Sequence, residues 1–145
     1  LADPTRYDTV ERINKRIKNR DFWMPFTPTI CYENCKKYIE IAPNSYSPYM
    51  TMAYNLKKGY ENKLPAVIHQ ADKTSRPQML KRKDNPDYYD ILKEFEKLSG
   101  FPVLLNTSFN IHGDAIVENA DQAISTLEKT DIDVLLLSGK AIIRK

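Results

Sequence analysis

Hydrophobic positions recur with helical spacing over a stretch that begins at Pro86 and ends before Gly100. Apolar residues three or four positions apart form a single stripe here: Tyr88, Ile91, Leu92, Phe95 and Leu98. Asp84 and Asn85 can cap the start, proline suits the first helical position, and glycine suits the end. The pattern therefore predicts a helix with well-defined ends.

Three further helices are expected from weaker patterns. Over residues 8–20, Val10, Ile13 and Ile17 share one face. The remaining face is basic, with Arg12, Lys15, Arg16, Lys18 and Arg20. A capping-box pattern at residues 119–122 predicts a helix to about residue 129, and residues 33–39 form a short one.

Between these helices lie runs rich in β-branched, aromatic and aliphatic residues, for which we expect strands. The predicted strands are residues 29–32, 49–56, 66–69, 79–80, 103–105, 133–137 and 141–144. Residues 103–105 and 133–137 are apolar throughout, as in buried strands. A tight turn is expected at 138–140, and a polar turn or a mobile loop at 57–63. The alternation predicts an α/β (α+β) domain, a twisted mixed sheet flanked by helices.

The strand at residues 103–105 changes character abruptly at its end. Uncharged hydrogen-bonding side chains follow it at once: Asn106, Thr107, Ser108 and Asn110. Gly113 gives the backbone freedom to turn or to let a ligand approach. Open α/β sheets bind ligands just beyond such strand ends, although the same residues also form Asx and Ser turns. Both interpretations remain open on the pattern alone.

Two cations leave the first predicted helix together, and an aromatic segment with two prolines, residues 21–28, follows them. Lys18 is a point charge and Arg20 a planar fork, a combination suited to clamping phosphates. The alternative is that both cations only complement the helix dipole.

A second polar segment, residues 69–78, contains one imidazole, one carboxylate, hydroxyls and a guanidinium. His69, Asp72, Thr74 and Arg76 are its potential ligand groups, although a solvated hairpin tip has the same composition. The basic run at residues 81–83 is better explained as a solvated turn. If it bound RNA, the affinity would fall steeply with salt.

Composition narrows these possibilities. The chain has 145 residues, 41% of them hydrophobic and 28% charged, which describes one ordinary globular domain. Its net charge of +3 suits an anionic ligand but is small for a nucleic-acid binder. Cys31 and Cys35 match no zinc pattern, and we expect reduced thiols in a cytoplasmic protein without a metal site. Because the chain starts at Leu1, we expect it to be part of a longer polypeptide.

Five ordered motifs resemble the C-terminal region of NodU-type carbamoyltransferases, a resemblance that runs nearly end to end. They begin with Leu1-Ala-Asp-Pro and are completed by residues 17–28, 47–50, 65–78 and 102–110. That region is similar to the YrdC-like fold, also found in HypF and in threonylcarbamoyl-adenylate synthases. In that fold a Lys-x-Arg and a Ser-x-Asn motif line a nucleotide and anion site. Lys18-x-Arg20 and Ser108-x-Asn110 match them.

The resemblance implies an ATP-dependent O-carbamoyltransferase in two parts. This YrdC-like domain would convert carbamoyl phosphate and ATP to carbamoyl-adenylate. An N-terminal ASKHA-class domain, absent from residues 1–145, would pass the carbamoyl group to a small-molecule hydroxyl.

The resemblance also assigns roles to individual residues. Lys18, Arg20 and Arg76 would be catalytic, the first two holding ATP phosphates together with Mg²⁺. The substrate and nucleotide pocket would be lined by Asn106, Thr107, Ser108, Asn110, Thr74, His69 and His112. The expected partners are ATP, carbamoyl phosphate and the protein's own N-terminal domain; neither a membrane nor nucleic acid is expected. The alternatives are a non-catalytic docking domain and a basic RNA-binding module.

Overall fold

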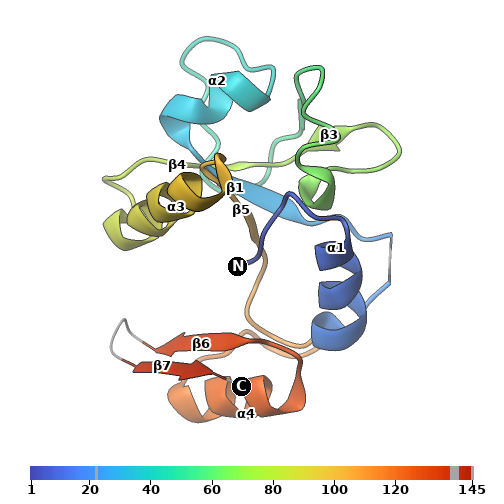
Figure 1. Cartoon of the computed structure of the whole chain (residues 1–145), viewed down its shortest axis with the longest axis vertical. Coiled ribbons are helices and arrows are strands. Elements are labelled where there is room, and N and C mark those ends of the chain that lie inside the picture. Colours follow the sequence, from blue (N-terminus) through green and yellow to red (C-terminus); the bar gives the residue numbers. More distant parts are fainter. Residues whose placement is uncertain (22, 138–140, 145) are drawn as a thin grey trace. The chain divides into compact units, whose positions relative to one another are not determined.

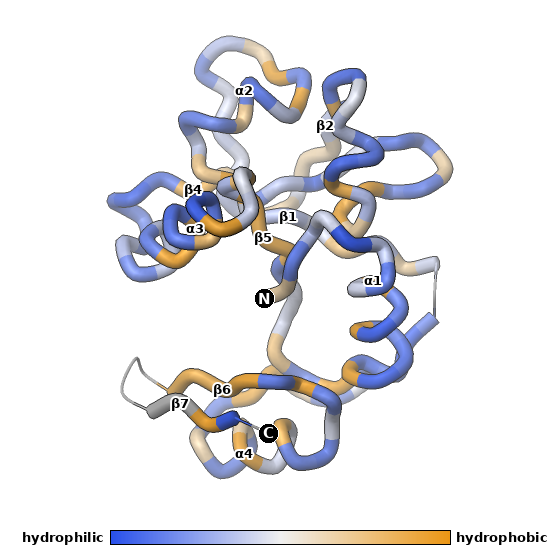
Figure 2. The backbone as a smooth tube through the Cα atoms, viewed as in Figure 1, coloured by the Kyte–Doolittle hydropathy of each residue, from blue (hydrophilic) through white to orange (hydrophobic). Residues whose placement is uncertain are grey.

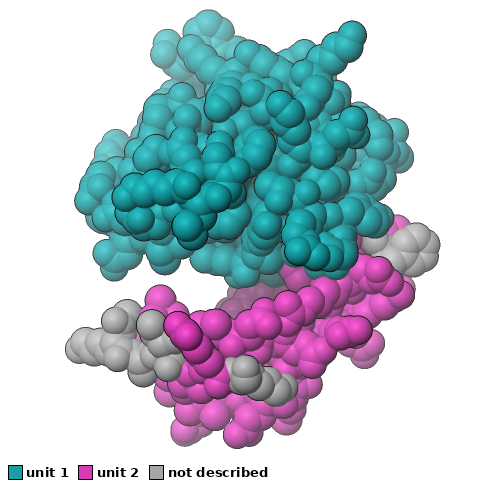
Figure 3. All heavy atoms as spheres, in the orientation of Figure 1, with its two compact units in different colours: residues 1–9, 25–107 teal, residues 10–24, 108–145 magenta. Residues whose placement is uncertain are grey.

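A computed structural model describes residues 1–21, 23–137 and 141–144 of the chain. The chain divides into two compact units, which are coloured separately in Figure 3. Unit 1 consists of Leu1–Thr9 and Pro25–Thr107, and unit 2 of Val10–Met24 and Ser108–Lys145. The chain crosses from one to the other within the first helix, before Pro25, and directly after the strand that ends at Asn106.

Unit 1 is built on a three-stranded sheet in the order β4-β1-β5 (Figure 1). The central strand β1 (Thr27–Cys31) runs parallel to β4 (Gln78–Leu80) and antiparallel to β5 (Val103–Asn106). The directions are mixed, as expected. β5 is buried except at its last residue, because it is apolar until Asn106.

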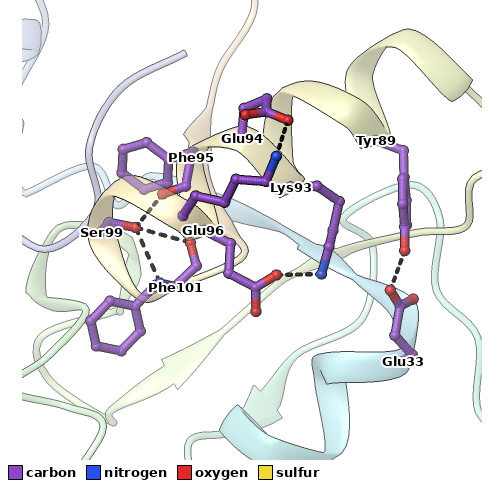
Figure 4. A network of polar contacts seen from close by, with 9 residues as sticks. Glu33, Tyr89, Lys93, Glu94, Phe95, Glu96, Ser99 and Phe101 are labelled. Carbon is purple, nitrogen blue, oxygen red and sulfur yellow. Dashed lines mark hydrogen bonds and ion pairs between the residues drawn. The ribbon is translucent and has the colours of Figure 1, made fainter.

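Helix α3 (Pro86–Ser99) packs on this sheet and has the ends that the sequence predicts. The Asn85 side chain accepts a hydrogen bond from the Tyr88 backbone N–H at 3.0 Å, and Gly100 has a φ of 78°. At its last turn, the Ser99 hydroxyl donates to the Phe95 carbonyl and accepts from the Phe101 N–H (Figure 4). The chain therefore turns directly from α3 towards β5.

The core between α3 and the sheet contains Cys31, Leu80, Leu92 and Leu104, all buried, with Tyr88, Tyr89 and Phe95 packed against them. The predicted apolar stripe is only partly correct. Ile91 is 40% exposed and Leu98 is 87% exposed, so the buried face of α3 is centred on Leu92.

The remaining elements of unit 1 are short: η2 (Tyr32–Asn34), α2 (Cys35–Tyr38), β2 (Tyr54–Asn55), η3 (Pro65–Val67) and β3 (Thr74–Ser75). η2 and α2 confirm the predicted short helix, and β2 pairs with β3 in a separate two-stranded sheet. The strand predicted for residues 49–56 is confined to β2. The strand predicted for residues 66–69 is wrong, because Pro65 begins a 3₁₀ turn instead.

Unit 2 contains helices from the beginning and the end of the chain. α1 (Asp8–Arg12) continues into the π-helix η1 (Ile13–Lys18), which ends at Asn19 with a φ of 50°. α4 (Ala120–Lys129) starts at Asn119, whose side chain accepts from the Gln122 N–H at 3.0 Å. The capping prediction is therefore confirmed.

Strands β6 (Val134–Leu137) and β7 (Ala141–Arg144) form an antiparallel pair beside α4. Both strands were expected, and Figure 2 shows that β6 is mostly hydrophobic. β6 is nevertheless not a fully buried strand. Leu135 faces Ala123 and Leu127 of α4, whereas Val134 and Leu136 are 49% and 50% exposed, because α4 covers only one face. The turn predicted at 138–140 lies outside the described residues.

The α/β class is thus confirmed, with strands distributed over a mixed sheet and two antiparallel pairs. Within the part of the chain that is described, no helix has both the length and the apolar character needed to cross a membrane.

We expect Leu92→Ala to lower the free energy of unfolding by about 2–5 kcal/mol, because it leaves a cavity beneath α3. Leu98→Ala on the same helix removes an 87% exposed side chain and should change it by about 0.5 kcal/mol or less. Urea unfolding of both variants checks this. Equal effects would contradict the assignment of the buried face.

Candidate functional site

The predicted Lys-x-Arg and Ser-x-Asn motifs come together within unit 2. The Lys18 ammonium donates to the Ser108 backbone carbonyl, to the Ser108 hydroxyl at 3.2 Å and to the Asn110 side-chain oxygen at 2.7 Å. The His112 backbone N–H in turn donates to the Lys18 carbonyl at 2.9 Å. The end of η1 is therefore joined to the loop that follows β5 by four hydrogen bonds.

The loop itself is closed by its own side chains. The Ser108 hydroxyl donates to the Asn110 side-chain oxygen at 2.6 Å, and the Asn110 amide donates to the Asp114 carbonyl at 2.8 Å. Gly113, with a φ of 92°, allows the turn between them. The turn interpretation is therefore confirmed, and the same residues hold the Lys18 ammonium; the ligand-site interpretation stays a prediction.

Lys18 does not lie on the solvent-facing basic side of its helix, which corrects the sequence prediction. Only 4% of the residue is exposed. Burial, with a contribution from the nearby charge of Arg20, lowers the pKa of the Lys18 ammonium to about 8. A lysine in this environment changes its charge close to physiological pH.

Arg20 lies two residues further along and is held by oxygens of unit 2. Its Nε donates to the Asn14 side-chain oxygen at 2.7 Å, and its Nη2 donates to the Met24 carbonyl at 3.1 Å. Burial lowers the pKa of the guanidinium from its ordinary value. Asn14, which the sequence analysis missed, is 1% exposed. The only signal for it was a polar residue between the apolar positions Ile13 and Ile17.

His112 contributes its backbone rather than its imidazole to this cluster. The residue is exposed, and its N–H meets the Lys18 carbonyl. The structure assigns no hydrogen bond to its ring within the described residues.

The other predicted site residues belong to unit 1. At the end of β5, the Asn106 amide donates to the Thr29 hydroxyl at 3.2 Å and to the Gln78 side-chain oxygen at 3.1 Å. Thr29 is fully buried and donates to the same Gln78 oxygen at 2.8 Å. These bonds link all three strands of the sheet, so Asn106 has a structural role here; Thr107 beside it is half-buried.

Residues 69–74 form a tight turn, as the hairpin-tip alternative requires. The His69 N–H donates to the Thr74 carbonyl at 2.8 Å, and the Asp72 carboxylate accepts from the Thr74 N–H and hydroxyl. These bonds from Thr74, with a smaller contribution from His69, lower the pKa of Asp72 to about 2. The His69 Nδ1 lies 2.9 Å from Asp72, so His69 and Thr74 both serve the turn.

Arg76 lies between β3 and β4 and is exposed. Its neighbour Ser75 is buried and donates to the Val67 carbonyl at 2.7 Å, which anchors the segment on which Arg76 stands. No hydrogen bond or ion pair to Arg76 occurs within residues 1–21, 23–137 and 141–144. The predicted role of Arg76 in binding an anion stays a prediction.

Two cations of the basic run at residues 81–83 contact neighbouring side chains of unit 1. The Lys81 ammonium lies 4.3 Å and 3.8 Å from the ring centroids of Tyr32 and Tyr46, and Arg82 makes two hydrogen bonds to Asp90. Residues 82–84 form an exposed turn, which agrees with the predicted solvated turn.

Comparison with known proteins places these motifs in a family. A family model described as carbamoyltransferase C-terminus matches residues 1–145. The chain belongs to this family. The resemblance to NodU-type carbamoyltransferases is confirmed, and it extends over the whole of the chain rather than the motifs alone.

Three curated relatives of the carbamoyltransferase C-terminus family illustrate the match. An uncharacterized protein of Methanocaldococcus jannaschii is 44% identical over 98% of this chain and 27% of its own length. Nodulation protein NolO of Bradyrhizobium diazoefficiens is 36% identical over 100% of this chain and 26% of its own. Nodulation protein U of Sinorhizobium fredii is 35% identical over 85% of this chain and 21% of its own length. The chain thus spans about a quarter of the length of these relatives.

Because Lys18 is buried, its ionisation should make the free energy of unfolding increase with pH. Folding lowers its pKa from 10.5 to about 8, so between these values the unfolded state binds more protons. The free energy of unfolding should therefore rise for the wild type relative to Lys18→Met as the pH increases through this window. Urea unfolding at about pH 7 and about pH 9.5 measures the difference.

Lys15→Met is the matched control, because that lysine is exposed on the same helix. A difference between wild type and Lys18→Met that is constant or falls with pH would contradict a lowered pKa at Lys18.

Proposed function

We propose that this chain is the carbamoyl-adenylate-forming part of an ATP-dependent O-carbamoyltransferase. The observation that supports the proposal best is the cluster in unit 2. There, Lys18 and Arg20 leave one helix end, and Lys18 meets Ser108 and Asn110. Two cations beside uncharged hydrogen-bonding groups suit a polyanion, and membership in the carbamoyltransferase C-terminus family supplies the reaction class.

The proposed reaction has two steps. Water converts carbamoyl phosphate to carbamate and inorganic phosphate. A carbamate oxygen then attacks the α-phosphorus of ATP, the bond to the β-phosphate oxygen breaks, and carbamoyl-adenylate and pyrophosphate are formed. Because the attack brings two anions together, the protein must mainly position the reactants and neutralise charge.

Each cationic residue has a distinct task in this proposal. Lys18 and Arg20 of unit 2 hold the phosphates of ATP, whereas Arg76 of unit 1 stays a predicted ligand of carbamoyl phosphate or carbamate. Ser108 and Asn110 donate or accept hydrogen bonds without adding charge. Lys18 would exchange at least one of its loop contacts for a phosphate oxygen, and the loop oxygens would keep the ammonium close by.

Mg²⁺ would accompany ATP rather than bind to the protein first. The described part of the chain contains no group of three His, Cys, Asp or Glu side chains arranged to hold a metal ion. In this proposal the ion is held mainly by the phosphate oxygens of the nucleotide.

Transfer to an acceptor lies with the rest of the protein in this proposal. An N-terminal ASKHA-class domain would pass the carbamoyl group to a small-molecule hydroxyl in the cytoplasm. The alternative is a domain that docks on this partner without catalysis, which predicts an intact complex and no nucleotide binding.

The test is ATP–pyrophosphate exchange that depends on carbamoyl phosphate, measured in the full-length protein. We expect exchange in the wild type and a loss of at least about tenfold in Arg20→Gln, since a planar donor fork is removed. Arg16→Gln is the matched control, because Arg16 is exposed and contacts Asp131 instead. Absence of exchange in the wild type would overturn the proposed function.

A further inference from the structure

Asn14 is the centre of the contacts that fix the end of the first helix. Its backbone carbonyl accepts the N–H groups of Asn19 and, at 3.0 Å, of Arg20. Its side-chain oxygen accepts Nε of Arg20 at 2.7 Å. Both the backbone and the side chain of Arg20 are therefore attached to one residue, six positions earlier.

The burial of Asn14 is unusual for an amide. Only 1% of it is exposed, and its side-chain nitrogen has no hydrogen-bond partner within the described residues. An amide with one end unpaired is costly in a protein interior. A residue that only filled space between Ile13 and Ile17 would be better apolar, so the side-chain oxygen is what this position requires.

Two of the acceptors that meet Arg20 are neutral. Asn14 offers an amide oxygen to Nε, and Met24 offers a backbone carbonyl to Nη2. A carboxylate in the place of the amide would hold the guanidinium equally well. It would also cancel the positive charge that an anionic ligand needs.

We propose that Asn14 is a positioning residue of the anion site. It orients the Arg20 guanidinium through a neutral acceptor, which adds no negative charge beside the phosphate oxygens of a ligand. The phosphate ligand rests on the proposed function, whereas the orientation of Arg20 does not.

Two substitutions test separately whether Asn14 orients Arg20 and whether its neutrality matters for anion binding. Asn14→Ala removes the acceptor, and Asn14→Asp keeps an acceptor oxygen but adds a negative charge. For each variant, NMR would follow the Arg20 Nε–Hε resonance, assigned by its loss in Arg20→Lys. Calorimetry would give the affinity for inorganic pyrophosphate and for MgATP. Arg16→Gln, an exposed change on the same helix, is the control.

For Asn14→Ala we expect the protected Nε–Hε resonance to be lost and both affinities to fall by about tenfold. For Asn14→Asp we expect the resonance to be kept and both affinities to fall by at least about tenfold, because the charge is cancelled. If Asn14 had only a structural role, Asn14→Asp would not lower the affinities while keeping the Arg20 Nε–Hε resonance.

Wild-type affinity in Asn14→Asp would overturn the proposal, as would an unchanged Nε–Hε resonance in Asn14→Ala. If Asn14→Ala did not fold, the affinity of Asn14→Asp would still support or overturn the proposal. A wild-type protein that binds neither pyrophosphate nor MgATP would overturn the proposed function, while the resonances would still show whether Asn14 orients Arg20.

Discussion

The hydrogen bonds of the Lys18 ammonium are the interaction on which the second unit depends. Unit 2 is assembled from two segments far apart in the sequence, Val10–Met24 and Ser108–Lys145. Lys18 joins them through Ser108 and Asn110, and the His112 N–H returns a bond to its carbonyl. Further along, Arg12 pairs with Asp133 at 2.7 Å and the Asp131 N–H meets the Arg16 carbonyl. The Arg12–Asp133 pair is more exposed, so Lys18 is a buried link between the segments.

The same contacts create a conflict between structure and chemistry. A lysine that satisfies its donors on the loop contributes to the fold, but it is less available to a ligand while those bonds persist. Its lowered pKa records the cost of burying the charge. An arriving phosphate would both neutralise that charge and accept a hydrogen bond, so ligand binding and the relief of the buried charge would favour each other.

Local patterns with their own physical signals could be predicted from the sequence. The ends of α3 and α4 follow from Asn85, Gly100 and Asn119, since caps depend on residues next to them in sequence. Burial depends on what packs against an element, and the sequence does not contain that information directly. Leu98 and Leu136 therefore looked like core residues although they are exposed.

In the candidate site, too, residue types could be predicted from the sequence but burial could not. The cations and the uncharged loop could be selected from sequence, because their types and spacing carry the signal. That Lys18 is buried could not be predicted, because it depends on the π-helix widening the turn Ile13–Lys18. An ordinary α-helical wheel places Lys18 with Lys15 and Arg16 on the basic side, and that assumption produced the error.

The π-helix also accounts for the positions of Asn14, Lys18 and Arg20. Helices of this kind are rare and occur mostly as single turns, frequently at functional sites. Here the wide turn places Asn14 and Lys18 on the buried side, and Asn19 then adopts a left-handed conformation. That reversal brings the Arg20 N–H back onto the Asn14 carbonyl. Because the helix must end in this way for both cations to be held, its irregular geometry and the composition of the Lys-x-Arg motif are parts of the same constraint.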